Sequence, residues 1–167
     1  YGFLLSPICR DKDALQATTI ILEMALYYKN KGMTLKQVLN RIYDEYGYHY
    51  DKVESLSLKG SDGLAKIQEI MRTLRATDIP ELAGNKVATK EDYLEQVSVT
   101  GNERTPITLP KSNVLRFVFE DGSFVAIRPS GTEPKVKFYF ALAGKTQKDA
   151  IARHDKIKQA ILDYIKE

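Results

Sequence analysis

The sequence is organised around one stretch in which two strand-like runs flank a short loop. The entering run covers residues 123–127 and the leaving run covers residues 136–140. Between them the sequence reads Arg128-Pro129-Ser130-Gly131-Thr132-Glu133-Pro134-Lys135. Strands joined by a short connection lie next to each other in a sheet. The stretch therefore predicts two neighbouring strands with a polar, proline-bounded loop at one end.

The composition of this loop suits a rigid anion-binding site. Arg128 offers a planar fork of donors that can pair with two phosphate oxygens at once. Ser130 and Thr132 add hydroxyl donors, and Gly131 allows the backbone to approach a ligand closely. An ordinary turn between two strands uses the same residue types for local reasons. The spacing alone leaves both interpretations open.

Composition and charge argue against several classes of protein: nucleic-acid-binding, disulfide-bonded and membrane-spanning proteins. The 167 residues carry a formal net charge of +3, with Lys and Arg scattered along the chain. A nucleic-acid-binding face needs clustered basic residues, so no nucleic-acid partner is expected. The single cysteine, Cys9, excludes an internal disulfide and favours a reducing, cytoplasmic compartment. No apolar run reaches membrane-spanning length, and the start at Tyr1 without methionine suggests a piece of a longer protein.

The first part of the chain predicts two helices, over residues 13–30 and 34–47. Asp13 is placed to cap the first, and Thr34 with Gln37 forms a capping-box pattern for the second. The first helix is apolar around most of its circumference, which is typical of a helix covered on several sides.

The second part predicts alternating strands and helices. We expect a strand over 53–59, a helix from 64 to about 77, one or two strands within 84–100 and a polar loop over 101–112. The strand signal strengthens at 113–119, where apolar residues alternate, and Asp121-Gly122 is typical of a two-residue hairpin turn. A last strand over 135–143 leads to a helix capped by Thr146. On this helix Ile151 is expected in the apolar stripe, and His154, in or beside it, is interpreted as a helix-surface residue.

These elements predict an α+β fold. An antiparallel sheet of four or five strands, with helices on one face, follows a two-helix segment that resembles the remnant of an α/β domain. A boundary is expected near residue 50.

Three motifs, in order along the chain, resemble one enzyme family. The loop at 128–135, the stretch Arg10-Asp11-Lys12-Asp13 and the stretch Leu109-Pro110-Lys111-Ser112-Asn113-Val114-Leu115 are similar to segments of the α-D-phosphohexomutases, which include phosphoglucomutase and phosphomannomutase. The resemblance implies a C-terminal fragment of a four-domain enzyme. Residues 1–50 would be the helical end of the third domain. Residues 51–167 would be the fourth, phosphate-binding domain, with a fold like the TATA-binding protein.

The resemblance also implies an activity and a site. Members of this family are isomerases of carbohydrate metabolism that transfer a phosphoryl group between the 1- and 6-positions of a hexose phosphate, through a 1,6-bisphosphate. The matching loop holds the phosphate that is not reacting, which assigns phosphate contacts to Arg128, Ser130, Gly131 and Thr132. Lys137 matches a position that is often basic, although a solvated lysine on an edge strand fits there equally well. Lys12 matches a catalytic lysine near the reacting hydroxyl, an assignment that depends on the resemblance alone.

The family's Mg²⁺ ion and phosphoserine belong to domains that have no counterpart in this sequence. The chain alone is therefore expected to be inactive and to hold neither. Its expected partners are hexose phosphates and further copies of itself, through the apolar surface of residues 13–47. The alternative is a stand-alone module that binds sugar phosphates or other anions without catalysis.

Overall fold

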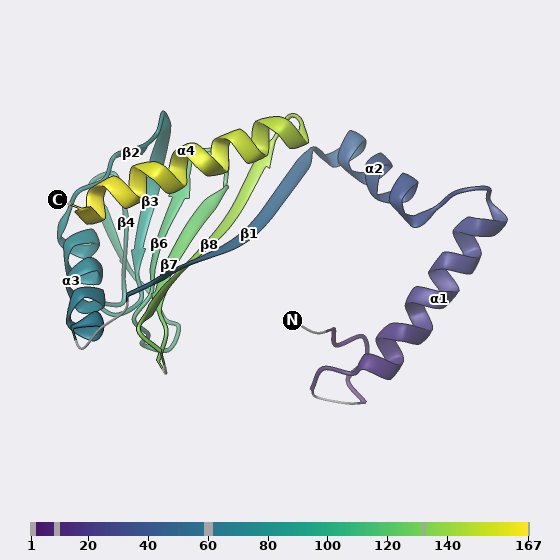
Figure 1. Cartoon of the computed structure of the whole chain (residues 1–167), viewed down its shortest axis with the longest axis horizontal. Helices are drawn as coiled ribbons and strands as arrows, with labels where there is room; N and C mark the ends of the chain where they lie inside the picture. The colour runs from purple at the N-terminus through teal and green to yellow at the C-terminus, as the bar shows by residue number, and fades with distance from the viewer. Residues whose placement is uncertain (1–2, 9–10, 59–61, 132, 167) are drawn as a thin grey trace. The chain divides into compact units, whose positions relative to one another are not determined.

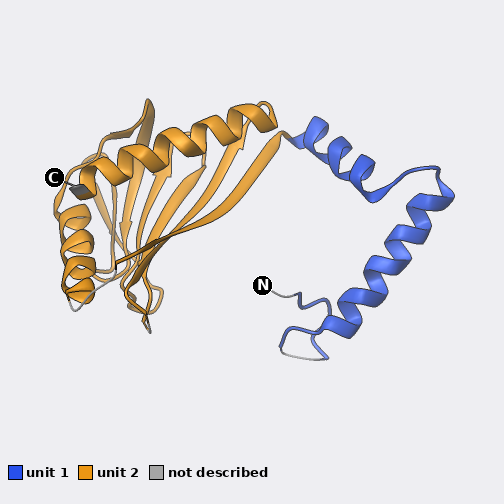
Figure 2. Ribbon diagram, in the orientation of Figure 1, with its two compact units in different colours: residues 1–46 blue, residues 47–167 orange. Residues whose placement is uncertain are grey.

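The protein, analysed as a computed structural model, divides into two compact units. The structure describes residues 3–8, 11–58, 62–131 and 133–166. Unit 1 is Tyr1–Tyr46 and unit 2 is Gly47–Glu167, as Figure 2 shows by colour. The division falls between Tyr46 and Gly47, so that residues 48–50 belong to the first strand of unit 2.

Unit 1 contains two helices, α1 (Ala14–Asn30) and α2 (Leu35–Tyr46), as the sequence predicted. The Asp13 carboxylate accepts hydrogen bonds from the backbone N–H groups of Leu15 and Gln16 at 2.9 and 3.1 Å. Thr34 and Gln37 form the predicted capping box, with reciprocal bonds of 2.8 and 3.3 Å. These bonds satisfy donors that a helix leaves unpaired at its N-terminus, which fixes where each helix begins.

The two helices of unit 1 bury no residue. Their large apolar side chains are largely exposed: Leu15, Ile20, Ile21, Leu22, Met24, Leu26, Tyr27, Leu39, Ile42 and Tyr46. Within the described residues, no helix is both long and apolar enough to cross a membrane.

Unit 2 is built on an antiparallel sheet with the strand order β1-β8-β7-β6-β3-β4-β5, and β2 pairs with β3 (Figure 1). The bounds are β1 Tyr48–Ser57, β2 Glu81–Leu82, β3 Asn85–Asp92, β4 Val97–Thr100, β5 Glu103–Pro106, β6 Leu115–Phe119, β7 Phe124–Pro129 and β8 Lys135–Gly144. The predicted α+β class is confirmed. The sheet has more strands than the four or five expected, because β5 lies within the predicted loop 101–112 and because β3 and β4 both form.

Two helices, α3 (Gly63–Ala76) and α4 (Gln147–Lys166), pack with one face of this sheet into a single core. Alternate residues of β6 and β8 are buried, which confirms the alternation predicted for residues 113–119. The core consists of these side chains: Ile67, Ile70, Met71, Leu74, Ile79, Leu82, Leu115, Phe117, Phe119, Val125, Ile127, Val136, Phe138, Phe140, Leu142, Ile157 and Ile161. The residues that alternate with them in β7 and β8 lie on the opposite, open face.

The apolar stripe of α4 differs from the predicted one at two positions. Ile151 is exposed, and Ala150 is fully buried instead. His154 is 3% exposed, so its assignment to the helix surface was wrong. Its ring lies edge-on between Tyr50 and Phe140, with centroid distances of 5.5 and 4.6 Å, because β1 joins the sheet next to β8 and brings Tyr50 over the helix.

The turn between β6 and β7 has three residues rather than the expected two. The Phe119 N–H donates to the Ser123 carbonyl at 2.8 Å, and the Gly122 N–H donates to the Phe119 carbonyl at 3.0 Å. Gly122 adopts a φ of 81°, whereas a two-residue turn of the preferred type needs positive φ at Asp121 as well, which Asp121 lacks. The geometry is that of a turn followed by a glycine bulge.

Arg153 of α4 anchors this turn. Its Nη1 lies 2.6 Å from Asp121 Oδ2 and donates to the Ala143 carbonyl at 2.8 Å. The hydrogen bond from Arg153 holds the pKa of the Asp121 carboxyl below its ordinary value, and the bonds from Ser123 act in the same direction.

The lowered pKa of Asp121 predicts a pH-dependent contribution to stability. A carboxyl whose pKa is lower in the folded state stabilises the fold above its unfolded-state pKa, near 3.9, and loses that contribution as the pH falls through the folded-state value. Asp121→Asn should therefore cost stability at pH 7, and the difference from the parent should shrink at about pH 3. Urea unfolding at both pH values measures it. A difference that is equal at both pH values would show that the charge contributes nothing.

Candidate functional site

The loop between β7 and β8 is held by backbone hydrogen bonds at its base. Pro129 and Val136 form the last register pair of the two strands. Beyond them, the Ser130 N–H donates to the Lys135 carbonyl at 2.8 Å. The Lys135 ε-amino group lies 3.0 Å from a Glu133 carboxylate oxygen, which pairs these two loop charges with each other. The predicted phosphate contact at Thr132 falls on a residue that lies outside the described ones.

Arg128 and Lys137 lie opposite each other across this strand pair. Arg128 is exposed and alternates with buried Ile127, while Lys137 alternates with buried Val136 and Phe138. Both side chains therefore lie on the open face of the sheet. No described residue forms a hydrogen bond or an ion pair with either cation. Two adjacent cations without a carboxylate partner form a positively charged spot beside the loop, which favours an anionic ligand.

Lys137 does not lie on an edge strand, contrary to the interpretation offered from the sequence. Strand β8 lies between β7 and β1, so that Lys137 has Arg128 on one side and Ser55 on the other. Ser55 could not be predicted as a neighbour of Lys137, because β1 and β8 are far apart in the chain. Its hydroxyl extends the row of donors across a third strand.

Gly131, in contrast, needs no special backbone conformation among the described residues. Its φ lies outside the positive range, and a Cβ added to it would meet no described atom within 4 Å. Neither packing nor a left-handed turn within the described chain explains glycine at this position. Gly131 is exposed, so its backbone is accessible from solvent.

The segment after β1 and the first residue of α3 both contact the loop. The Leu58 N–H donates to the Pro134 carbonyl at 3.0 Å. A Cβ added to Gly63 would lie 2.5 Å from the Leu58 carbonyl oxygen and 3.2 Å from Pro134 Cβ. The first residue of α3 must therefore be glycine for this close contact with the loop to form.

Gly63→Ala should destabilise unit 2 by about 1–3 kcal/mol, the usual cost of inserting a methyl group into a site without room. The clash is with a backbone oxygen, which cannot rotate away as a side-chain end can. Urea unfolding measures the change. Gly131→Ala is the matched control and should leave stability unchanged. Equal stability of the Gly63 variant and the parent would contradict the tight junction.

Lys12, the predicted catalytic residue, lies in unit 1, whereas the other described candidates lie in unit 2. Its ε-amino group is 2.8 Å from Asp11 Oδ1, and both side chains are mostly exposed. The hydrogen bond from Lys12 lowers the pKa of the Asp11 carboxyl. A role for Lys12 near a reacting hydroxyl stays a prediction.

No group of three or more His, Cys, Asp or Glu side chains that could hold a metal ion occurs among the described residues.

A family model described as "Phosphoglucomutase/phosphomannomutase, C-terminal domain" matches residues 62–162. The phosphoglucomutases of Staphylococcus aureus strains bovine RF122 / ET3-1 and MRSA252 are each 44% identical over 144 residues. In each case the match covers 85% of this chain and 26% of the relative, so that the chain spans about a quarter of the relatives' length.

One similar solved structure is the open form of pp63/parafusin from Paramecium, an exocytosis-sensitive phosphoprotein described as a phosphoglucomutase. The TM-score is 0.59 at 22% identity, over 96% of this chain and 28% of that one. At this identity the likeness shows the fold alone.

Proposed function

The chain belongs to the phosphoglucomutase/phosphomannomutase family, and on that premise we propose that it is the phosphate-binding C-terminal part of a hexose phosphomutase. In this proposal unit 1, residues 1–46, ends the third domain of such an enzyme, and unit 2, residues 47–167, forms the fourth. The complete cytoplasmic enzyme transfers a phosphoryl group between the 1- and 6-positions of a hexose phosphate. This part holds the phosphate that is not reacting.

The observation that carries the proposal is the pair of cations at Arg128 and Lys137, with which no described residue pairs, beside a loop that contains Ser130 and Gly131. A guanidinium group can donate two parallel hydrogen bonds to one phosphate, and a neighbouring ammonium group adds a second charge. Because neither cation has a carboxylate partner among the described residues, a phosphate would not have to displace one.

Such a loop contributes to catalysis by binding at a distance. Its donors contact only phosphate oxygens, so the same loop accepts a bisphosphate in either orientation of the sugar. The binding energy of the held phosphate is used to orient the distant hydroxyl that accepts the phosphoryl group. Phosphoryl transfer depends mainly on positioning and on stabilisation of charge, so little covalent chemistry is required of these residues. Lys12 is assigned to that reacting end, where an ammonium group stabilises negative charge or assists proton transfer.

The Mg²⁺ ion and the phosphoserine are assigned to other domains of the complete enzyme. When bound there, the metal ion would stabilise the charge of the transferring phosphoryl group. The present chain should therefore bind ligand without turning it over.

Titration of the isotope-labelled chain with glucose 1,6-bisphosphate tests the proposal, with amide chemical shifts as the readout. We expect weak, saturable binding with shifts concentrated at Arg128, Ser130, Gly131 and Lys137. A parallel assay for conversion of glucose 1-phosphate should show none. The proposal fails if the bisphosphate causes no shifts, or if they cluster away from the loop.

Self-association through unit 1 is the second part of the proposal. The large apolar side chains of α1 and α2 are exposed, and exposed apolar surface marks interaction sites. A second copy of the chain is the partner that every solution of the protein contains.

Sedimentation velocity at rising concentration should reveal dimers that Leu22→Glu dissociates, because a carboxylate in an apolar contact must lose its hydration. Leu64→Glu is the matched control, since Leu64 has a similar exposed fraction, 63% against 64%, but lies on α3. A parent that sediments as a monomer, or equal dissociation in both variants, would contradict self-association through these helices.

A further inference from the structure

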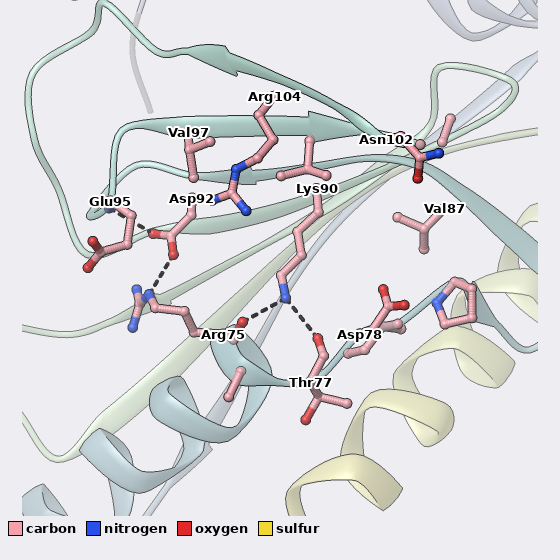
Figure 3. Close-up of a pocket in the computed structure, with 16 residues that line it drawn as sticks. Arg75, Thr77, Asp78, Val87, Lys90, Asp92, Glu95, Val97, Asn102 and Arg104 are labelled. Carbon is pink, nitrogen blue, oxygen red and sulfur yellow. Dashed lines mark hydrogen bonds and ion pairs between the residues drawn. The ribbon is translucent and has the colours of Figure 1, made fainter.

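A cavity of about 660 Å³ lies in unit 2 (Figure 3). None of the residues that line it belongs to the β7–β8 loop. It is bounded by the C-terminal end of α3, the segment 77–80 and strands β3, β4 and β5. The volume falls in the range of small-molecule sites in proteins. Apolar walls come from Ile79, Pro80, Val87, Val97 and Val99.

One charged pair in the wall is already satisfied. Arg75 Nε lies 2.7 Å from Asp92 Oδ2, and Asp92 is 5% exposed. The other carboxylate oxygen of Asp92 accepts from the backbone N–H groups of Leu94 and Glu95. Arg75 also donates to the Asn113 side chain at 2.9 Å. This pair holds α3 to β3, and its charges cancel locally.

Lys90 is less completely satisfied. Its ammonium group donates to the carbonyl oxygens of Arg75 and Thr77, each at 2.8 Å, and so closes the C-terminal end of α3. An ammonium group has three N–H donors, which leaves one for a ligand. Burial lowers the pKa of Lys90, and the carboxylates of Asp78 and Asp92 act in the opposite direction. The ammonium is therefore poorly hydrated, and a second anionic contact would replace solvation it has lost.

Arg104 supplies the second available cation. It lies on β5, which pairs with β4. No described residue forms a hydrogen bond or ion pair with its side chain. In Figure 3 its guanidinium group points into the cavity, towards Lys90 and Asp92. Arg104 is an exposed residue, and Asp92 is already held by Arg75, so the guanidinium donors of Arg104 have no partner among the described residues.

Two further carboxylates line the cavity. In Figure 3 the carboxylate of Glu95 points away from Lys90, at the side of the cavity. Asp78 lies close enough to Lys90 to affect its pKa, so it should weaken binding of an anion. The available donors of Arg104 and Lys90 would bind the acidic group of a ligand. The apolar wall beside them would contact the apolar part of the same ligand.

We propose that this cavity binds an organic acid: a carboxylate or phosphate monoester that carries an apolar or aromatic body. The acidic group lies between Arg104 and Lys90, and the body packs against Val97 and Val99. The site is separate from the loop at Arg128. Helix α3 begins against Pro134 of that loop and ends at the cavity, and its 14 residues span roughly 21 Å at 1.5 Å per residue.

Titration of the isotope-labelled chain with phenylacetate tests the proposal, with the neutral 2-phenylethanol as the matched probe. Phenylacetate should shift the amide resonances of Thr77, Lys90, Val99 and Arg104 in a saturable way, and 2-phenylethanol should bind at least tenfold more weakly. Phenyl phosphate, added in a second arm to parent and Arg128→Ala chains, should shift the same four residues in both.

Variants then assign the charges. Arg104→Gln should weaken phenylacetate binding about tenfold and leave the fold intact, because no described contact depends on this side chain. Asp78→Asn should strengthen binding a few-fold, because it removes a repelling carboxylate. Arg72→Gln, an exposed arginine on α3 outside the cavity, is the control and should change nothing.

Equal binding of the acid and the alcohol, or unchanged affinity in Arg104→Gln, would overturn the proposal. Neither result depends on the loop at Arg128, so this proposal and the phosphomutase assignment can fail independently.

Discussion

Arg128→Ala is expected to weaken the binding of glucose 1,6-bisphosphate by roughly 10- to 150-fold. Hydrogen bonds to charged groups contribute about 1.5–3 kcal/mol each, and 1.4 kcal/mol is a factor of ten in affinity. The estimate takes one such bond, because the second arm of a bidentate contact adds geometry more than independent energy. Isothermal titration calorimetry on parent and variant measures the ratio.

The fold should not change in this variant, because Arg128 is exposed and no described residue is bonded to it. Urea unfolding should give the same midpoint as the parent. Arg72→Ala is the matched control: it removes an exposed arginine whose described partner is Glu69 on the same helix, and should keep the parent affinity. Lys137→Ala should give a smaller loss than Arg128→Ala. Parent-like affinity in Arg128→Ala would refute the assignment of the loop to phosphate.

Phe117→Ala is expected to destabilise unit 2 by about 3–5 kcal/mol. Phe117 is fully buried at the middle of β6, a strand flanked by β7 on one side and β3 on the other. Truncation removes the apolar contacts of the ring and leaves a cavity that neighbouring strands, fixed by their ladders, cannot close. Because small domains are stable by only about 5–15 kcal/mol, the variant should lose a large part of the free energy of unfolding at 25 °C. Urea unfolding followed by circular dichroism measures the change.

The control for this experiment is Leu109→Ala, which removes an apolar side chain that is 56% exposed. Its effect should stay within about 0.5 kcal/mol. If the two variants lost similar stability, the core would not be organised around β6 as described.

Local patterns in the sequence were sufficient for most helices and strands. Side chains that cap or alternate act over a few residues, so Asp13, the pair Thr34–Gln37 and the alternation in β6 indicated their elements directly. The candidate site was also indicated locally, because Arg128 and Ser130 lie within a few residues of each other.

Features that depend on distant segments were missed or wrong. The strand β5 has a fully exposed, polar sequence, and it forms because β4 pairs with it. His154 was expected at the surface, since nothing near it in sequence reveals that Tyr50 and Phe140 enclose it. The cavity at Lys90 joins residues from 75 to 104, and no motif marks it.

By itself, then, the sequence determined the class of fold, the alternating inward faces of the strands and the composition of the polar loop, because each follows from backbone geometry over short distances. Only the tertiary structure decided that β1 lies beside β8, which places Ser55 next to Lys137 and encloses His154. It also decided that α3 starts against Pro134 and ends at a cavity. The reason is that pairing between distant strands depends on the free energy of the whole core, to which no single segment of the sequence is an adequate guide.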